Sequence, residues 1–439
     1  CWIFMTINKD TIFALSTATG KAALAVIRIS GTQAHKCLSE ISLNMPKQPN
    51  VATLNKIKNK EGLVIDHSIT TLFKKPKSFT GEDMVEISVH GGGAVIKEIY
   101  NTLLSFKNIR IGKPGEFTRR AFENNKLDLT QVEAIADIVN AETELQRQQA
   151  LSNLSGNFFI LSKEIFEDLK KILANIEAFI DFADEELPQN LMNKILEQIE
   201  NNIKTINKML EKSSGGALIR TGFIVTILGK PNAGKSSFIN NISDSNIAIV
   251  TSQPGTTTDI IESFVDIGGF PVRFLDTAGI RKSKNSVEKI GIKKALVASK
   301  ESNINLIFIE KFEDIKEFRD IKNPIFVKSK QDISKKSFIS DGFYNISSKN
   351  NYGVEDLLEI IRKKISDEVP PESLYISRER HIDCLEATRK SLISSKKAKT
   401  IDLIAEDIRQ AIKSLNSLFG NVDIEDILDI IFSDFCIGK

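Results

Sequence analysis

One glycine-rich segment has the residue types and spacing of a phosphate cradle. It reads Gly229-Lys-Pro-Asn-Ala-Gly-Lys-Ser-Ser237 and follows the apolar run Phe223–Leu228. A strand, a glycine-rich turn and a helix N-terminus, in this order, aim backbone N–H groups and the helix dipole at an anion. Lys235 would then reach the β- and γ-phosphates of a nucleotide, and the Ser236 hydroxyl would bind Mg²⁺. The alternative, a glycine turn that merely joins a strand to a helix, does not require the complete pattern.

Two downstream motifs could complete the site around the terminal phosphate. Pro254-Gly-Thr-Thr-Thr-Asp259 is a candidate switch I, in which Thr257 could join the Mg²⁺ shell. In the next motif, Asp276-Thr-Ala-Gly279, we expect Asp276 to act on Mg²⁺ and the Gly279 N–H to donate a hydrogen bond to the γ-phosphate.

Two further motifs could recognise the base. Ser329-Lys-Gln-Asp332 and Ser347-Ser-Lys349 each follow an apolar stretch. The Asp332 carboxylate could accept two hydrogen bonds from the guanine edge, which adenine cannot donate. Five motifs in this order predict a domain that hydrolyses GTP. The predicted GTP-binding residues are Asn232, Ala233, Gly234, Lys235, Ser236, Ser237, Thr251, Ser252, Gln253, Pro254, Gly255, Thr256, Thr257, Asp276, Thr277, Ala278, Gly279, Ser329, Lys330, Asp332, Ser347, Ser348 and Lys349.

Composition sets the broad class of protein. The chain has 439 residues, with 59 basic and 57 acidic side chains, 41% hydrophobic and 26% charged residues, which is ordinary for a soluble globular protein. The length allows two to four domains. Because the charges nearly cancel, any RNA contact must come from a local patch such as Arg389–Lys399, for which a solvated helix face is the favoured alternative.

The location of the protein is also constrained by its sequence. The apolar runs are too short to cross a bilayer, and the four cysteines show no paired spacing, so we expect a reducing, cytoplasmic location without a membrane contact. The segment Cys1–Met5 is apolar but lacks a basic n-region and is followed by polar residues, so we expect no signal peptide and expect Met5 to be the natural start.

The pattern of apolar and turn-forming residues divides the chain into three kinds of segment. Short strands such as Ala23–Ile29 and Met84–Val89 alternate with glycine turns in an N-terminal α+β domain. Apolar residues at helical spacing then predict a bundle, and the same texture returns near the C-terminus. Ser213–Gly216 and Asp367–Pro371 are expected to be linkers on either side of the nucleotide domain.

The expected architecture is a multidomain α/β protein. It comprises an N-terminal α+β domain (1–127), a helical domain whose first part (128–215) and second part (369–439) flank an inserted Ras-like P-loop GTPase domain (216–368), and a C-terminal Cys-Ile-Gly-Lys motif. A separate fourth domain at the C-terminus is the alternative, although that stretch is short for a core of its own.

Beyond these patterns, the chain resembles the MnmE (TrmE) family of GTPases that modify the wobble uridine of tRNA. The resemblance covers the sequence from Asp10 onward. Besides the nucleotide motifs it rests on Ser78-Phe-Thr-Gly-Glu-Asp83, Lys113-Pro-Gly-Glu-Phe117, Asn125-Lys-Leu-Asp-Leu129, Glu133-Ala-Ile-Ala-Asp137, Asp181-Phe-Ala-Asp-Glu-Glu186 and the ending Phe435-Cys-Ile-Gly-Lys439.

The resemblance implies a homodimer formed by a folate-binding-like N-terminal domain. It implies that 5-formyl-tetrahydrofolate or a related folate contacts Arg28, Glu86, Lys126 and Lys439. A carboxylate suits the guanine-like edge of a pterin, and cations suit its glutamate tail. From the residues alone, a simple salt bridge between Arg28 and Glu86 is the favoured alternative. Cys436 is a possible nucleophile or a positioning residue.

The resemblance also implies that potassium replaces an arginine finger. Its expected ligands are Asn232, Thr251, Gln253 and Thr256, whereas Ser236 and Thr257 hold Mg²⁺. Seen without the family, Asn232 would only pin its loop. Glu288 is expected to orient the attacking water, although without the family it would be interpreted as an exposed helix glutamate. Lys235 and Arg281 are the other expected catalytic residues, Arg281 as a partner in switch II.

Three positions depart from the pattern of the family. Gly20-Lys-Ala-Ala23 stands where an arginine and paired glycines are usual, Thr258 replaces an arginine, and Ser329 replaces the asparagine of Asn-Lys-x-Asp. Serine can donate to the base or brace the phosphate loop, but its reach is shorter. We therefore expect guanine selection to depend on Asp332, with weaker affinity.

The implied function is GTP hydrolysis that, with an MnmG-like FAD- and NADH-dependent partner in a heterotetramer, installs an aminomethyl-type group on C5 of the tRNA wobble uridine. One alternative is a regulatory GTP switch that binds RNA or the ribosome without modification chemistry. Another is a folate-binding module whose nucleotide domain no longer hydrolyses GTP.

Overall fold

The computed structural model describes residues 10–181, 191–211, 213–243, 248–249, 261–276, 297–333, 342–369, 376–420, 435 and 438. The chain forms two compact units. One contains Cys1–Ala136 with Asn416–Lys439, and the other contains Asp137–Leu415. Among the described helices, none combines the length and the apolar character that a membrane span requires.

The first unit is built on a six-stranded sheet in the order β3-β4-β5-β2-β1-β6. Its neighbours pair antiparallel except β1 and β6, which are parallel. The strands are β1 (Thr11–Leu15), β2 (Ala22–Ser30), β3 (Thr53–Lys58), β4 (Val64–Phe73), β5 (Met84–Gly91) and β6 (Ile109–Ile111), and the helices are α1 (Ala34–Ile41), α2 (Gly93–Leu104), α3 (Glu116–Glu123) and α4 (Leu129–Asn140), the last crossing into the second unit.

Alternation along β2 and β5 separates a core face from a polar face. Ile27, Ile29, Val85 and Ile87 are fully buried and share a cluster with Leu38. Because successive strand residues point to opposite faces, Arg28 and Glu86 lie on the other face, directly paired across the two strands.

The second unit contains a seven-stranded sheet in the order β13-β12-β11-β7-β10-β9-β8. β13, β12, β11, β7 and β10 run parallel, while β9 and β8 add antiparallel pairs. The elements are β7 (Phe223–Gly229), α9 (Lys235–Ser243), β8 (Ala248–Ile249), β9 (Ile261–Ile267), β10 (Phe270–Asp276), β11 (Ile304–Phe308), the 3₁₀ helix η2 (Phe312–Phe318), β12 (Pro324–Lys328), β13 (Phe343–Asn345) and α11 (Val354–Glu368).

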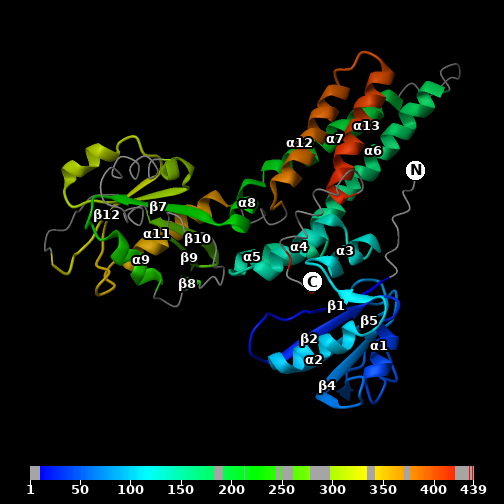
Figure 1. Cartoon of the computed structure of the whole chain (residues 1–439). Helices are drawn as coiled ribbons and strands as arrows, with labels where there is room; N and C mark the ends of the chain where they lie inside the picture. Colours follow the sequence, from blue (N-terminus) through cyan, green and yellow to red (C-terminus); the bar gives the residue numbers. More distant parts are fainter. Residues whose placement is uncertain are drawn as a thin grey trace, which may run out of the picture. The chain divides into compact units, whose positions relative to one another are not determined.

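A helical part completes the second unit, with α6, α7, α12 and α13 side by side (Figure 1). Its helices are α5 (Glu144–Leu154), α6 (Asn157–Asp181), α7 (Leu191–Glu211), α8 (Ser213–Thr221), α12 (Glu379–Ser395) and α13 (Ile401–Phe419). The apolar spacing read from the sequence is confirmed, because Ile165, Leu169, Ile172 and Ile176 are all buried on α6. The fold class, a multidomain α/β protein with a helical part and a P-loop sheet, is also confirmed.

The predicted linker Ser213–Gly216 is wrong, since these residues begin helix α8. Glycine has low helix propensity, but here one tertiary and one local hydrogen bond favour the helix. The Gly216 carbonyl accepts a hydrogen bond from Gln149 Nε2 at 2.9 Å, and the Ser213 hydroxyl donates to the Leu210 carbonyl at 2.7 Å. The second expected linker also starts inside a helix, because α11 continues to Glu368, and part of it lies outside the described residues.

Candidate nucleotide site and N-terminal polar region

The phosphate loop occupies the carboxyl end of β7, a central strand of the parallel sheet (Figure 1). This is the edge at which open α/β sheets bind ligands. Gly229 ends the strand with φ +137°, and a Cβ there would lie 2.3 Å from the Phe308 carbonyl oxygen. A side chain is therefore excluded by β11, and the chain can turn sharply into helix α9, which begins at Lys235.

The Lys235 ammonium group is enclosed by its own loop. The residue is only 5% exposed, and Nζ donates to the carbonyls of Gly229 at 2.6 Å and Lys230 at 2.7 Å. A buried cation at a helix N-terminus attracts an anion, because the helix dipole adds positive charge at the same point. These residues fit the phosphates of a nucleotide.

Ser236 and Asp276 bring two oxygen donors together next to that lysine. The serine hydroxyl donates to Oδ2 of the buried Asp276 at 3.3 Å. Asp276 ends β10, the strand beside β7. A hydroxyl and a carboxylate are the hard oxygen ligands that Mg²⁺ prefers, so this pair fits a nucleotide-associated magnesium ion.

The Ser329 motif braces the phosphate loop from the neighbouring strand end. The Ser329 hydroxyl donates to the Ala233 carbonyl at 2.5 Å, and Lys330 Nζ donates to the Asn232 carbonyl at 2.5 Å. A Cβ at Gly234, where φ is +95°, would lie 2.5 Å from the Ser329 hydroxyl. Asn232 adopts φ +62°, a left-handed conformation that asparagine tolerates well.

Asp332 and Ser347 meet on the side of the site predicted for the base. The fully buried Ser347 donates through its hydroxyl to Asp332 Oδ1 at 2.8 Å. The Ser348 carbonyl accepts from Asn241 Nδ2 at 2.9 Å, which ties this segment to α9. Lys349 is exposed. The structure thus brings the Asp332 motif and the Ser347 motif together. Ser329, at the start of the Asp332 motif, connects them to the phosphate loop through its hydrogen bond to Ala233.

Several predicted site residues lie outside the described residues. They are Thr251, Ser252, Gln253, Pro254, Gly255, Thr256, Thr257, Thr277, Ala278, Gly279, Arg281, Glu288, Cys436 and Lys439. Apart from Asn232, the predicted potassium shell is therefore not part of the geometry above, and neither are switch I, most of switch II and the candidate catalytic glutamate.

In the first unit, Arg28 and Glu86 form the salt bridge that the residues alone favoured. Arg28 Nε and Nη2 donate to Glu86 Oε1 at 3.0 and 2.8 Å. The guanidinium also lies over the rings of Phe79 and Phe117, at 5.2 and 5.9 Å from their centroids. Both charged side chains remain partly exposed, so they can also meet a ligand. Lys126 is exposed, and its stem lies against Gly81.

Gly438, the described glycine of the C-terminal motif, reaches the same strand region. The Gly438 carbonyl accepts a hydrogen bond from the Ser16 hydroxyl at 3.0 Å. With φ +101°, a Cβ at Gly438 would lie 2.2 Å from the Leu15 carbonyl oxygen. Only glycine fits this approach, which gives a physical reason for glycine in the ending. Because Ala14 pairs with Arg28, Gly438 lies near the end of the strand beside the Arg28–Glu86 pair.

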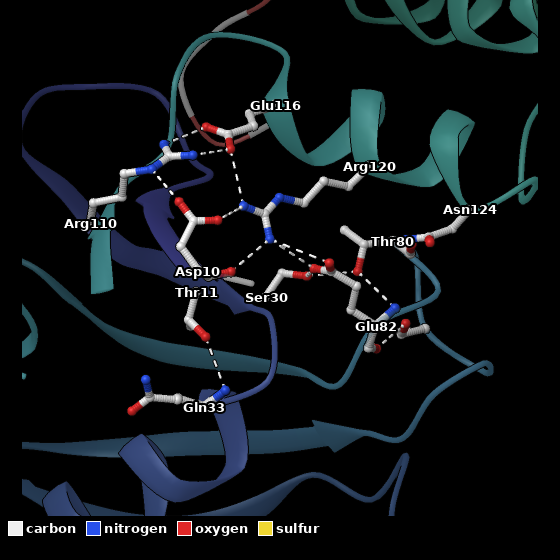
Figure 2. A network of polar contacts seen from close by, with 11 residues as sticks. Asp10, Thr11, Ser30, Gln33, Thr80, Glu82, Arg110, Glu116, Arg120 and Asn124 are labelled. Atoms are coloured by element: carbon white, nitrogen blue, oxygen red, sulfur yellow. Dashed lines mark hydrogen bonds and ion pairs between the residues drawn. The ribbon is translucent and has the colours of Figure 1, made fainter. Parts of the chain in front are cut away.

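A partly buried ion network, which the sequence did not reveal, lies at the start of β1 and the end of β2 (Figure 2). Arg120, with a side chain 4% exposed, bonds to Asp10 at 2.8 Å, to Glu82 at 3.1 Å and to Glu116 at 3.1 Å. Arg110 adds bonds of 2.6 Å to Asp10 and 2.5 Å to Glu116. Glu82 and Glu116 belong to two of the family motifs. The signal in the sequence that could have indicated the network is the presence of Arg110 and Arg120 close to Glu116.

The network fixes the protonation state of its most enclosed carboxylate. Burial by itself raises the pKa of Glu116, but hydrogen bonds from Arg110 and from the Lys113 N–H outweigh it and hold the pKa at about 2. Hydrogen bonds from Ser30 to Glu82 and from Asn124 to the Thr80 carbonyl, both 2.7 Å, extend the network to β2 and the end of α3. Segments far apart in sequence are thereby held in one arrangement.

Known proteins resemble the chain over nearly its whole length. A family model described as the GTP-binding protein TrmE N-terminus matches residues 11–126, and one described as the MnmE helical domain matches residues 129–436. Curated relatives carry the name tRNA modification GTPase MnmE. That of Anaplasma phagocytophilum is 40% identical over 98% of this chain and 99% of its own. That of Pelagibacter ubique is 41% identical over 98% of this chain and 100% of its own.

Solved structures that are similar to part of the chain include the G domain of the T. maritima FeoB iron transporter. It is 19% identical and covers 33% of this chain and 97% of its own, with a TM-score of 0.25. The assignment therefore rests on the family models and the curated relatives. On those grounds the chain belongs to the MnmE family of tRNA modification GTPases.

Proposed function

We propose that this chain hydrolyses GTP in a potassium-stimulated reaction that supports modification of the tRNA wobble uridine. Family membership carries the coarser part, a GTP hydrolase with a role in tRNA modification. The observation that best supports nucleotide binding by this particular chain is the enclosed Lys235 ammonium group beside the Ser236–Asp276 pair.

The phosphate loop and the residues around it have distinct roles in binding the nucleotide. Backbone N–H groups of Ala233–Ser237 bind the phosphates, and Lys235 exchanges its carbonyl partners for phosphate oxygens. Asp332, held by Ser347, accepts the donors of the guanine edge. Ser236, Thr257 and Asp276 would hold Mg²⁺, which supplies positive charge at the β- and γ-phosphates.

Residues of the switches would complete the reaction. Asn232, Thr251, Gln253 and Thr256 would hold potassium, which supplies transition-state charge stabilisation between the α- and γ-phosphates. Glu288 would orient the attacking water, and Arg281 would assist from switch II.

The N-terminal unit would supply the one-carbon unit. Arg28, Glu86 and Lys126 would contact a formyl-tetrahydrofolate, with Lys439 nearby and Cys436 as a nucleophile or a positioning residue. The bonding of Gly438 near the end of β1 supports this arrangement. The existing Arg28–Glu86 salt bridge implies that the folate either shares or displaces that contact. We further propose a homodimer that works with an MnmG-like flavoprotein on tRNA in the cytoplasm.

The test of the proposal is the dependence of hydrolysis on the monovalent cation. GTP turnover by the full chain should be at least about tenfold faster in potassium than in sodium at equal ionic strength, an electrostatic effect on the transition state. The Asn232→Ala variant should lose most of that difference while still binding GDP. Equal rates in the two salts would contradict the potassium mechanism.

A further inference from the structure

An acidic segment outside the nucleotide motifs lies against the phosphate loop. β11 pairs with β7 so that Phe308 stands opposite Gly229, and the chain then continues through Glu310 into η2. Because neighbouring parallel strands end at the same edge of the sheet, the segment Glu310–Glu317 arrives beside the loop that follows β7.

Asp314 is the one buried charged side chain among the described residues of this segment. Its Oδ2 accepts the backbone N–H groups of Glu310 at 3.2 Å and Lys311 at 3.0 Å, and its side chain is 10% exposed. Its Oδ1 accepts a hydrogen bond from Lys230 Nζ at 2.6 Å. That bond, together with the two N–H groups, lowers the pKa of the Asp314 carboxyl, so it is an anion at neutral pH.

Lys230 joins this anion to the inside of the phosphate loop. Its side chain also lies 3.1 Å from Glu317, while its backbone carbonyl accepts Lys235 Nζ at 2.7 Å and the Ala233 N–H at 3.3 Å. The residue that Asp314 holds from outside is therefore the one that positions both the phosphate-binding lysine and the next turn of the loop.

The other side of the loop is held in a related way. Lys330 Nζ donates to the Asn232 carbonyl and lies 3.9 Å from Glu310. Asp314 thus binds a lysine of the loop, and Glu310, at the other end of the same short turn, lies near a lysine that contacts the loop. Of the two, only Asp314 combines a short bond with a buried, prearranged carboxylate.

We propose that Asp314 is a positioning residue for nucleotide binding, acting through Lys230 to fix the path of the phosphate loop. The proposal rests on the nucleotide-binding function proposed above. Exposed ion pairs contribute little by themselves. This pair differs because one partner is already bonded by its own turn, so that little ordering remains when the charge-assisted bond forms. Loosening it should let the loop N–H groups drift from the geometry that phosphates need.

The experiment is a double-mutant cycle of Lys230→Met and Asp314→Asn in the full chain, read by titration with fluorescent GDP and GTP. Asparagine keeps an oxygen for the N–H groups of the turn, and methionine keeps most of the lysine stem. Each single variant should raise Kd by about threefold to tenfold. The double variant should bind no more weakly than the weaker single variant, because both changes remove one interaction.

Two controls separate positioning from general stability. Glu317→Gln removes an exposed partner of the same lysine and should change Kd less than Asp314→Asn does. Glu359→Gln breaks the exposed 2.7 Å pair with Arg362 on α11 and should leave Kd unchanged. Melting temperatures recorded alongside distinguish a loss of fold from a loss of loop geometry.

The contradicting results are distinct. Single variants with Kd within twofold of wild type, whether or not their melting temperature falls, would overturn the positioning role, as would additive effects in the double variant. If Asp314→Asn fails to fold, Lys230→Met alone decides in the same way. A wild-type chain that binds neither GDP nor GTP would instead overturn the nucleotide-binding function itself.

Discussion

Ser329 retains one part of the role of the asparagine that is usual in its motif. A hydroxyl has a single proton to donate, and that proton is used on the Ala233 carbonyl. The serine therefore braces the phosphate loop but has no donor left for the base. We infer that recognition of guanine depends on Asp332, whose position is fixed by Ser347.

At Asp332, a change of one atom should exchange the preferred base. Asp332→Asn introduces an amide that can donate to the C2 carbonyl of xanthine, where the carboxylate accepts from the C2 amino group of guanine. The variant should bind xanthosine diphosphate better than GDP, with a selectivity shift of at least about tenfold, about 1.4 kcal/mol. Competition titrations with both nucleotides measure it.

The outcome at this residue also weighs one alternative function. Wild-type protein that binds ADP as tightly as GDP would mean that Ser329 has weakened base recognition beyond what Asp332 can restore. The folate-binding module with an inactive nucleotide domain would then become the better account. An unchanged nucleotide preference in Asp332→Asn would separately contradict the role given to this carboxylate.

At the scale of elements, the strand–loop–helix unit was predictable because every local signal agreed. The apolar run forms β7, and α9 begins at Lys235. Gly229 and Gly234 have positive φ angles and lie where a Cβ would clash with β11 or with Ser329. Ser213–Gly216 was mispredicted because Gly-Gly has a low helix propensity. The hydrogen bond from Gln149 that stabilises the helix there comes from a residue distant in sequence.

The ion network around Arg120 could not be predicted for a related reason. Arg120 and Asp10 are 110 positions apart, and neither lies in a motif with a recognisable spacing. The sequence reading did contain Glu82 and Glu116, but as family markers without a physical reason. The structure supplies that reason, since both carboxylates bind the buried guanidinium group of Arg120.

The network should make the stability of the first unit depend on pH. The pKa of Glu116 is lowered from 4.5 to about 2 on folding. A depressed folded-state pKa gives stability that is present above the unfolded value and is lost as the pH falls toward the folded value. Glu116→Gln should therefore lower unfolding free energy by on the order of 3 kcal/mol at pH 7, and by clearly less near pH 3.

Chemical denaturation of wild type and Glu116→Gln at both pH values measures this difference. Arg119–Glu123 offers a matched control, because it is a more exposed pair on the same helix, and Glu123→Gln should cost little at either pH. A Glu116→Gln penalty that is equal at pH 7 and pH 3 would show that packing, and not the ionised carboxylate, sets its contribution.

At the scale of the whole molecule, the division into domains at residues 127, 215 and 368 remains a prediction. The structure groups Asn416–Lys439 with the N-terminal unit, and Phe435 packs with Leu129 and Val132. Both ends of the chain therefore contribute to one unit, while the nucleotide motifs lie in the other. The proposed function requires the two units to act together on one tRNA.

The most direct test of the proposed role in tRNA modification is nucleoside analysis of tRNA from cells that lack this protein. Wobble uridines should lose their aminomethyl-type C5 substituent. Wild-type chain should restore it, and Lys235→Ala, which removes the phosphate-binding ammonium group, should not. Unchanged wobble nucleosides in the deficient cells would contradict a role in modification and favour the regulatory GTP switch. Full restoration by Lys235→Ala would contradict a role for GTP hydrolysis in the modification.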